Sequence, residues 1–423
     1  MRRAAVPLLL LALTTPLHGQ TLSDRVSQLF TFGDCGDPLC LDVNAAVHGD
    51  HYNPSVVQGE NNLLAFLNGA IGLSVGNLPF TAATSGVTFS FGAGAPVATT
   101  VSPGPIFGER AQTLGRGRLL VGATVNGIAF DNVRGVPLND VNFIFTHQNT
   151  AGAALGDPTF ERDIIRVSTN LDLSLLVTSL VASYGVTDRI DFGIALPIVR
   201  ASLSGSSDAM FEQYDPGASP HYFGTDANRT LVAQSSASGD AIGIGDIGGR
   251  IKVNAYQDES RGVALVGDVR LPTGNEDDFL GSGATTVRVI GVASARFGNF
   301  TPHVNAGYQY TSASDLNNRL LATLGFDHLV SERVTVAGDL LGSFETGQSR
   351  LLLPDPVVYT APDVRTVELT DIPRKDDNFV DASFGAKFSA GQDFRIIANV
   401  VFPLAKAGVR PTALWTVGLE RTF

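Results

Sequence analysis

From residue 118 to the C-terminus, the sequence alternates between apolar and polar positions in stretches of roughly ten to fourteen residues, each followed by a turn. Residues 189–198 show the pattern clearly, because Ile190, Phe192 and Ile194 alternate with Asp191 and Gly193. The stretches 246–255 and 333–345 repeat it. Successive side chains of a strand point to opposite faces, so each stretch predicts a β-strand with one apolar and one polar face. The fold class is therefore expected to be all-β.

The links between these stretches distinguish a barrel from a two-sheet sandwich. Short links alternate with long ones along the chain. The short links are 185–188, 257–261, 298–299, 329–332 and 389–393, and the long ones are 204–242, 273–283, 311–318 and 346–377. Transmembrane barrels keep short turns on the periplasmic side and long loops outside, whereas a sandwich does not require this alternation. We therefore expect a transmembrane antiparallel β-barrel over residues 116–423.

The number of strands follows from counting the alternating stretches. If 118–131 is the first ascending strand and 163–184 the descending one, the count through 414–423 is twelve. An even count places both ends of the barrel on the same side. Fourteen strands would result if 86–91 and 96–101 formed a further hairpin of the wall. We expect twelve.

Aromatic residues support a membrane location. Those beside the short links are Tyr184, Tyr256, Phe297, Phe300, Phe388 and Phe394. They are typical of an interfacial girdle, the alternative being aromatic residues that only close hairpins. At the C-terminus, Trp415, Val417, Leu419 and Phe423 share one face, which resembles the signature read by the barrel-assembly machinery of the outer membrane. Arg421 departs from that signature, where an apolar residue is usual.

The N-terminus predicts export. Arg2 and Arg3 precede the apolar run 4–17, which is typical of a signal peptide, here residues 1–19. In an oxidising compartment we expect Cys35 and Cys40 to form a disulfide. After the signal, no apolar run approaches the ~20 residues of a membrane helix. The net charge of −12, without a basic cluster, argues against binding nucleic acid.

Residues 20–115 do not show the alternating pattern of apolar and polar positions that marks the rest of the chain. Leu22, Val26, Leu29 and Phe30 fit one face of a short helix, with Thr21 and Asp24 as its capping pair. The run 61–73 predicts a second helix. A segment of this length before the first wall strand is expected to plug the barrel, with Glu109 and Arg110 as candidate plug residues. A periplasmic segment without a gating role is the alternative.

The polar face of the strands contains charges of both signs in similar numbers. Candidate lumen-lining residues are Asp246, Arg250, Lys252, Asp268, Arg270, Arg288, Arg296, His303, Asn305, Gln309, Asp339 and Glu345. A ring of one sign would indicate ion selectivity. A balanced set favours ion pairs across the lumen, while a subset of these residues lines a narrow polar path.

Catalytic chemistry finds little support in the sequence. His48 and His51, near Asp42, have the spacing of a metal cluster, but an exposed polar turn explains them better. His147 and His221 lie in predicted loops without a defined nucleophile or carboxylate beside them. We expect neither an enzyme nor a bound metal or cofactor.

Two groups of motifs carry a family resemblance. The first comprises Gly245-Asp246-Ile247, residues 267–274 (GDVRLPTG) and Gly281-Ser282-Gly283, and the second is the run 107–118. Over residues 105–423 the chain resembles the outer-membrane family named for the meta-cleavage pathway of phenol degradation. The resemblance implies a barrel grouped with channels for hydrophobic and aromatic small molecules. We expect a monomeric barrel in the outer membrane of a Gram-negative bacterium, for passive uptake of small hydrophobic or aromatic compounds. The alternative is a structural or adhesive barrel whose external loops bind a partner.

Overall fold

The computed structural model describes residues 20–32, 89–90, 97–98, 104–146, 163–213, 222–225, 227–314, 316–359, 364–391 and 393–423. Several predictions lie outside these residues. They are the signal peptide, the second helix at 61–73, the disulfide between Cys35 and Cys40, and the histidines His48, His51, His147 and His221.

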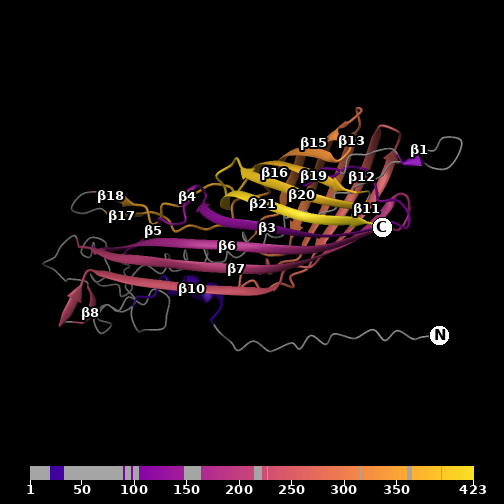
Figure 1. Ribbon diagram of the computed structural model, residues 1–423. Helices are drawn as coiled ribbons and strands as arrows, with labels where there is room; N and C mark the ends of the chain where they lie inside the picture. The colour runs from indigo at the N-terminus through magenta and orange to yellow at the C-terminus, as the bar shows by residue number, and fades with distance from the viewer. Residues whose placement is uncertain are drawn as a thin grey trace, which may run out of the picture.

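Twelve antiparallel strands close into a ring within the described residues (Figure 1). In ring order they are β7 (Ile190–Glu212), β11 (Gly248–Gln257), β12 (Arg261–Arg270), β13 (Thr286–Ala295), β14 (Phe300–Thr311), β15 (Arg319–Ser331), β16 (Val334–Glu345), β19 (Phe379–Ala390), β20 (Phe394–Pro403), β21 (Val409–Thr422), β3 (Leu119–Val133) and β6 (Ile164–Gly185). β6 pairs again with β7, which closes the cylinder. The predicted twelve-stranded barrel is confirmed.

The fourteen-strand alternative is wrong. β1 (Phe89–Ser90) and β2 (Val97–Ala98) pair only with each other, in a two-stranded sheet separate from the wall. Three further strands add to the wall without joining the ring, namely β4 (Val136–Pro137), β5 (Val141–Thr146) and β10 (Val232–Ile244). Short hairpins β17 (Val357–Tyr359) with β18 (Arg365–Val367), and β8 (Phe223–Thr225) with β9 (Asn228–Thr230), lie in the long loops.

The seam of the cylinder joins the two ends of the barrel at the short-turn side. Leu119 and Phe423 exchange two backbone hydrogen bonds, with N–O distances of 3.2 and 2.7 Å. The predicted girdle residues lie at the same side, and all of them are exposed on the outer surface. Tyr256 and Phe297 are the most exposed of the six, at 53% and 65%.

Strands β6 and β7 continue far past the cylinder, which the sequence pattern did not predict (Figure 1). Residues 204–242 were expected to be a loop, but β7 runs to Glu212 and β10 begins at Val232. β5 pairs with the outer end of β6, and β10 pairs with the outer part of β7. We call this four-stranded sheet the outer extension. The expected loop is wrong because strand alternation persists there with exchanged faces.

The exchange of faces is visible along β7. Its outward side chains are apolar over 192–198 but charged or small and polar over 200–208. Its inner face changes in the opposite sense, from Asp191 in the cylinder to buried Leu203 and Phe211 beyond it. An apolar exterior is stable only against lipid and a polar exterior only against water. The outer boundary of the membrane therefore lies between Ile198 and Arg200.

The neighbouring strands change at the same level. Leu176 of β6 pairs with Arg200, and the outward side chains of β6 below it are apolar or aromatic except Thr178, while those above it are polar. Ile242 of β10 pairs with Arg200 from the other side and is 72% exposed, whereas the outward residue above it is Asp240. Three strands thus agree on one boundary.

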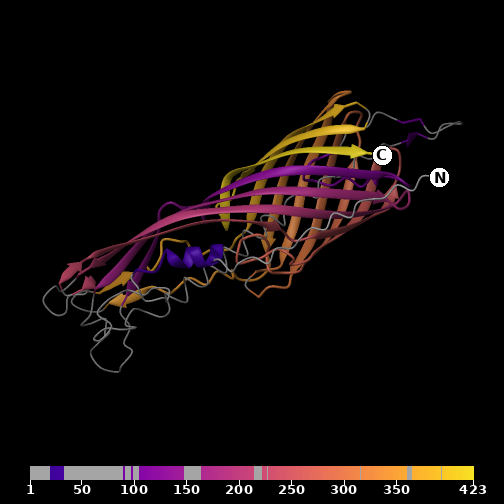
Figure 2. The same ribbon diagram turned by 60° about the horizontal axis from the view of Figure 1, so that its bottom comes forward.

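The N-terminal helix α1 (Leu22–Gln28) packs on the inner face of the outer extension, outside the cylinder (Figure 2). Its predicted cap is confirmed, because Thr21 Oγ1 accepts from the Asp24 N–H at 3.1 Å and Asp24 Oδ2 accepts from the Thr21 N–H at 2.8 Å. Leu22, Val26 and Leu29 are buried in a core shared with β5, β6, β7 and β10. Among the described residues no helix is long and apolar enough to cross a membrane.

Candidate functional site in the barrel interior

Residues 104–115, which we call the crossing segment, traverse the bore near its short-turn end. Ile106 packs against Ala337 of β16 and Ile397 of β20 on one side. On the other side, the Leu114 N–H donates to Asp191 Oδ2 at 2.8 Å. The chain then leaves beside the β6–β7 turn and enters β3. The predicted plug region therefore divides, since α1 packs on the outer extension while the crossing segment lies in the bore.

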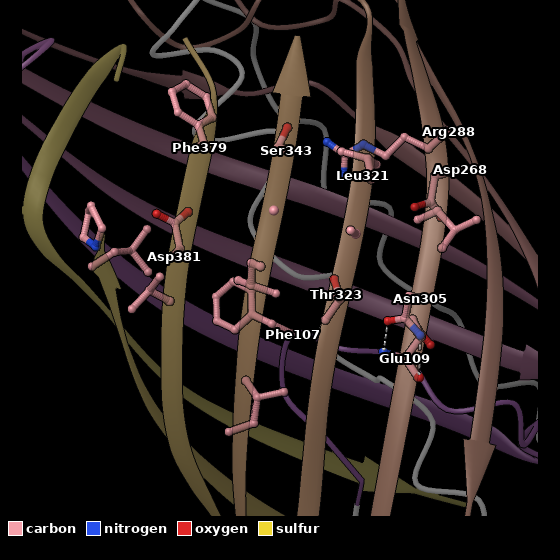
Figure 3. A pocket seen from close by; sticks show the side chains of 18 of the residues that line it. Phe107, Glu109, Asp268, Arg288, Asn305, Leu321, Thr323, Ser343, Phe379 and Asp381 are labelled. Atoms are coloured by element: carbon pink, nitrogen blue, oxygen red, sulfur yellow. Dashed lines mark hydrogen bonds between the residues drawn. The ribbon is translucent and has the colours of Figure 1, made fainter. Parts of the chain in front are cut away.

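Side chains of the barrel wall form hydrogen bonds with the backbone N–H and carbonyl groups of the crossing segment. Asn305 makes two hydrogen bonds with Glu109, accepting from its N–H at 2.9 Å and donating to its carbonyl at 3.0 Å (Figure 3). Ser294 Oγ accepts from the Ala111 N–H at 3.1 Å, and Asn254 donates to the Ala111 carbonyl at 2.7 Å. A buried extended chain without a strand partner needs such substitutes for ladder hydrogen bonds. The inward Asn and Ser residues supply them.

Three ion pairs fix the two charged residues of the crossing segment, Glu109 and Arg110. Glu109 binds Arg250 through one carboxylate oxygen and Lys252 Nζ through the other, the latter at 3.1 Å. Arg110 makes two hydrogen bonds to Asp327, with Nε–Oδ1 at 2.7 Å. The side chains of Arg110 and Asp327 are 2% and 0% exposed. Removing one partner of a buried pair leaves an uncompensated charge, which costs about 3–5 kcal/mol.

A third contact fixes the segment sterically. His303 Nε2 lies 2.7 Å from Asp339 Oδ1, and both side chains are fully buried. A Cβ on Gly108 would overlap the His303 ring and lie 2.6 Å from Asp339 Oδ1. Only glycine fits where the segment passes this pair.

On the outer side of the crossing segment the bore holds a cavity of about 210 Å³ (Figure 3). Charged side chains of β11, β12 and β13 form one wall, namely Arg250, Asp268, Arg270 and Arg288. Apolar side chains from the facing strands form the opposite wall, including Leu321, Leu341, Val401 and Leu414. Phe107 and Glu109 of the crossing segment lie at the base. The cavity is thus charged on one side, and its other side combines these apolar side chains with the Arg410–Asp381 ion pair.

The charged wall is ordered by strand register. Asp268 pairs with Arg250 on one side and Arg288 on the other. Arg250 Nε and Nη2 donate to the two oxygens of Asp268 at 2.6 and 3.0 Å. Arg288 Nε donates to Gln309 Oε1 at 2.8 Å. The guanidinium groups are therefore held in defined orientations.

A second cluster lines the cavity around Phe379 of β19. The guanidinium carbons of Arg319 and Arg410 lie 4.4 and 4.7 Å from the centre of the Phe379 ring. Arg410 binds Asp381, and Arg319 Nη1 lies 3.4 Å from Glu345. Cation–π contacts of this kind hold arginine flat against a ring. Here each arginine also forms an ion pair with a carboxylate.

Sequence alternation predicted which charged residues face inward. The candidates that meet at the cavity or the crossing segment are Arg250, Lys252, Asp268, Arg270, Arg288, His303, Asn305 and Asp339, together with Glu109 and Arg110. Gln309 and Glu345 bind arginines beside them. The ion pairs named here join strands that are adjacent or separated by one strand, such as Arg410 with Asp381, or join the wall to the crossing segment. Sequence reasoning missed Phe107, Arg319, Phe379 and Arg410.

Two candidates lie away from the cavity. Arg296 is at the short-turn rim, where Nη2 donates to the Glu259 carbonyl at 3.1 Å. Asp246 fastens the β12–β13 loop, because its oxygens accept from the Gly274 N–H at 3.1 Å and the Ser282 N–H at 2.9 Å. Thr273 Oγ1 also holds this loop, because it accepts from the Ile247 N–H and donates to the Gly245 carbonyl. Residues of the first group of motifs thus meet in one loop anchor, whereas the second group lies in and directly after the crossing segment.

No group of three or more His, Cys, Asp or Glu side chains that could hold a metal ion occurs in the described part of the chain.

The apolar outer surface of the cylinder and its polar interior together indicate where the protein is located. A closed antiparallel cylinder has no free edges, and its apolar band matches lipid while its polar side chains face the bore. The chain is an outer-membrane β-barrel.

Comparisons with known proteins give likenesses to solved outer-membrane proteins. No protein-family model matches the chain, and no curated protein sequence matches it. An outer membrane channel from Pseudomonas putida F1 is 13% identical, with a TM-score of 0.42, covering 74% of this chain and 98% of that one. The toluene transporter TodX of P. putida is 9% identical, with a TM-score of 0.31, covering 72% and 90%. A FadL homologue of Pseudomonas aeruginosa is 12% identical, with a TM-score of 0.31, covering 72% and 89%. The function is argued below from the residues of this chain.

Proposed function

We propose that this barrel is a channel for passive uptake of small hydrophobic or aromatic compounds across the outer membrane. The observation that carries the proposal is the cavity in the bore, which has an apolar wall and lies directly above the crossing segment. A barrel with only a structural role would fill its interior with packed side chains. A ring-sized space lined by Leu321, Leu341 and Val401 instead offers a binding step along a path.

We further propose that the crossing segment closes the path between the cavity and the periplasm. Its contacts are side-chain hydrogen bonds and ion pairs rather than a strand ladder, so it can leave without breaking the wall. Opening then requires loss of the Glu109 and Arg110 ion pairs. The strands that supply their partners remain paired with their neighbours.

Replacing Arg110 tests the closure. Arg110→Met removes the cation from Asp327 and is expected to loosen the crossing segment, giving larger or more frequent current steps in planar bilayers than the parent chain. Arg116→Met is the matched control, because Arg116 is exposed and its N–H, not its side chain, bonds Asp188 at 3.2 Å. Folding of each variant is checked by heat-modifiable migration on SDS gels.

The adhesive alternative makes the opposite prediction. The outer extension presents a polar face above the membrane, which suits a barrel that binds a partner outside the cell. In that case, folded parent and Arg110→Met chains would both be silent in bilayers and would not admit small aromatic compounds into liposomes. That result would contradict the channel proposal.

A further inference from the structure

The outer extension has one covered edge and one open edge. At the β5 edge, the Ile144 N–H donates to the Leu369 carbonyl at 2.9 Å, and Phe143 forms a β-bridge with Thr370. At the other edge, β10 pairs with β7 along its whole length of 13 residues. The second side of β10 forms no backbone hydrogen bond to any described residue. The sheet therefore ends in an unpaired strand.

The backbone groups that face this open edge can be assigned. Directly after β10, the Gly245 N–H donates to the Pro197 carbonyl of β7 at 2.9 Å. Directly before β10, the Leu231 carbonyl accepts from the Phe211 N–H of β7, and the register between the two bonds is uninterrupted. Backbone groups of an antiparallel strand alternate in direction, so odd-numbered residues of β10 face β7 and even-numbered ones face the open edge. The even-numbered residues above the membrane boundary, all of them exposed, are Val232, Gln234, Ser236, Ser238 and Asp240.

β10 lacks the features that usually protect an edge strand. Natural sheets protect their edges with proline, lysine, a bulge or a covering segment. β10 contains no proline, lysine or arginine, and its pairing with β7 has no bulge. Its side chains are mostly Ser, Ala and Gly, so a further backbone can approach to the normal distance between strands. Such an edge can accept an extended polypeptide as one more strand.

A second copy of this chain in the same membrane does not fit the open edge. Two copies in one membrane are related by rotation about the membrane normal. A twofold rotation of this kind places each edge-facing N–H opposite the same N–H of the other copy, rather than opposite a carbonyl. Antiparallel pairing of two β10 edges would require one of the barrels to be inverted. The occupant that fits is therefore a different polypeptide, outside the membrane.

The charges around the lower end of the open edge are mainly negative. Loop 271–285 contacts β10 there, since a Cβ on Gly243 would lie 2.9 Å from Leu280 Cδ1. The Ser23 N–H of α1 donates to the Asp277 carbonyl of this loop at 2.8 Å. The charged residues on α1, this loop, β10 and the facing part of β7 are Asp24, Asp240, Glu276, Asp277 and Asp278, with Arg25 and Arg200. Asp246 and Arg270 in the wall below add one charge of each sign. The excess of negative charge favours a cationic partner.

We propose that the open edge of β10 binds an extended cationic polypeptide from outside the cell, which adds to the outer extension as a further strand. Its backbone bonds the edge-facing N–H and carbonyl groups of β10. Its basic side chains meet the carboxylates beside α1. The site is separate from the bore, so the inference does not depend on the proposed channel function.

Fluorescence anisotropy with the full mature chain in detergent tests the inference. The probe is a labelled synthetic peptide in which lysine alternates with valine. This lysine peptide is expected to bind at least about tenfold more tightly than its glutamate counterpart at low salt, and high salt should reduce the difference. Hydrogen exchange in residues 232–244 should slow when the lysine peptide binds, because edge-facing amides become bonded.

Two substitutions at one position separate backbone pairing from side-chain contact. Ser236→Pro removes an N–H that faces the open edge and none that bonds β7, so it is expected to weaken binding of the lysine peptide at least about tenfold. Ser236→Ala keeps this N–H and should bind the peptide like the parent chain. Asp277→Asn should narrow the preference for the lysine peptide over the glutamate peptide. Folding of each variant is checked by heat-modifiable migration.

Three results would overturn the inference. The first is equal binding of the lysine peptide to folded Ser236→Pro and Ser236→Ala chains. The second is equal binding of the lysine and glutamate peptides to the parent chain. The third is a dimer of the parent chain that Ser236→Pro abolishes, since the occupant of the edge would then be another copy.

Discussion

At Gly108 the crossing segment passes the wall with no space for a methyl group. Parity along β14 and β16 predicted that His303 and Asp339 face inward, and both do. What parity could not predict is that they bond each other or that a glycine lies against them. Alternation assigns a residue to a face, whereas pairing depends on register and on a segment with no periodicity. For the same reason, alternation did not indicate that Phe107 lines the cavity.

Gly108→Ala is expected to displace the crossing segment without unfolding the barrel. The added Cβ overlaps the His303–Asp339 pair, and overpacking of this size costs about 1–3 kcal/mol. Bilayer recordings should show a higher open fraction than in the parent chain. Gly249→Ala is the control, since its Cβ would meet only Val269 at an ordinary 3.5 Å. Equal recordings for both variants would contradict a closing role for the segment.

Among the elements, β7 shows where sequence reasoning succeeds and where it fails. The alternation of apolar and polar residues predicted the strand and its lipid-facing side over 192–198. The sequence also predicted the helix cap at Thr21. The outer part of β7 lies in the link 204–242 that was expected to be a loop, but Ser204 and Ser206 are strand residues. Their role follows from the apolar residues between them, which the outer extension buries against α1. That tertiary contact is absent from the local pattern.

Cysteine labelling in whole cells tests the membrane boundary along β7. Both Ser204 and Ile194 are exposed and point outward, but they lie on opposite sides of the Ile198–Arg200 boundary. Ser204→Cys should react with a membrane-impermeant maleimide, and Ile194→Cys should not, because lipid covers it. The parent chain measures any background from Cys35 and Cys40. Equal labelling at both positions would place the boundary elsewhere.

The molecule as a whole is closed by its last residues. Phe423 completes the seam through backbone bonds to Leu119, while its ring lies 60% exposed on the outer surface. Strand number and closure could be predicted from the sequence, because link parity and a common side for both ends permit only even counts. The course of residues 20–115 could not, since it depends on contacts with distant strands.

Phe423→Ser is expected to lower the amount of folded barrel in the outer membrane severalfold. The substitution keeps the backbone seam but removes the terminal ring from the signature that the assembly machinery is expected to read. The measurement is the heat-modifiable fraction in isolated outer membranes. Phe297→Ser removes an equally exposed ring at the same rim and should have a much smaller effect. Similar losses in both variants would indicate a general need for rim aromatics.

The continuation of β6 and β7 determines where the protein first meets its surroundings. From Arg200 to Glu212 the strand has thirteen residues, and twelve steps of ~3.3 Å give roughly 40 Å of sheet. A sheet of that length carries its serine-rich outward face well beyond the lipid headgroups. Molecules from the medium can therefore meet this part of the protein before they reach the bilayer.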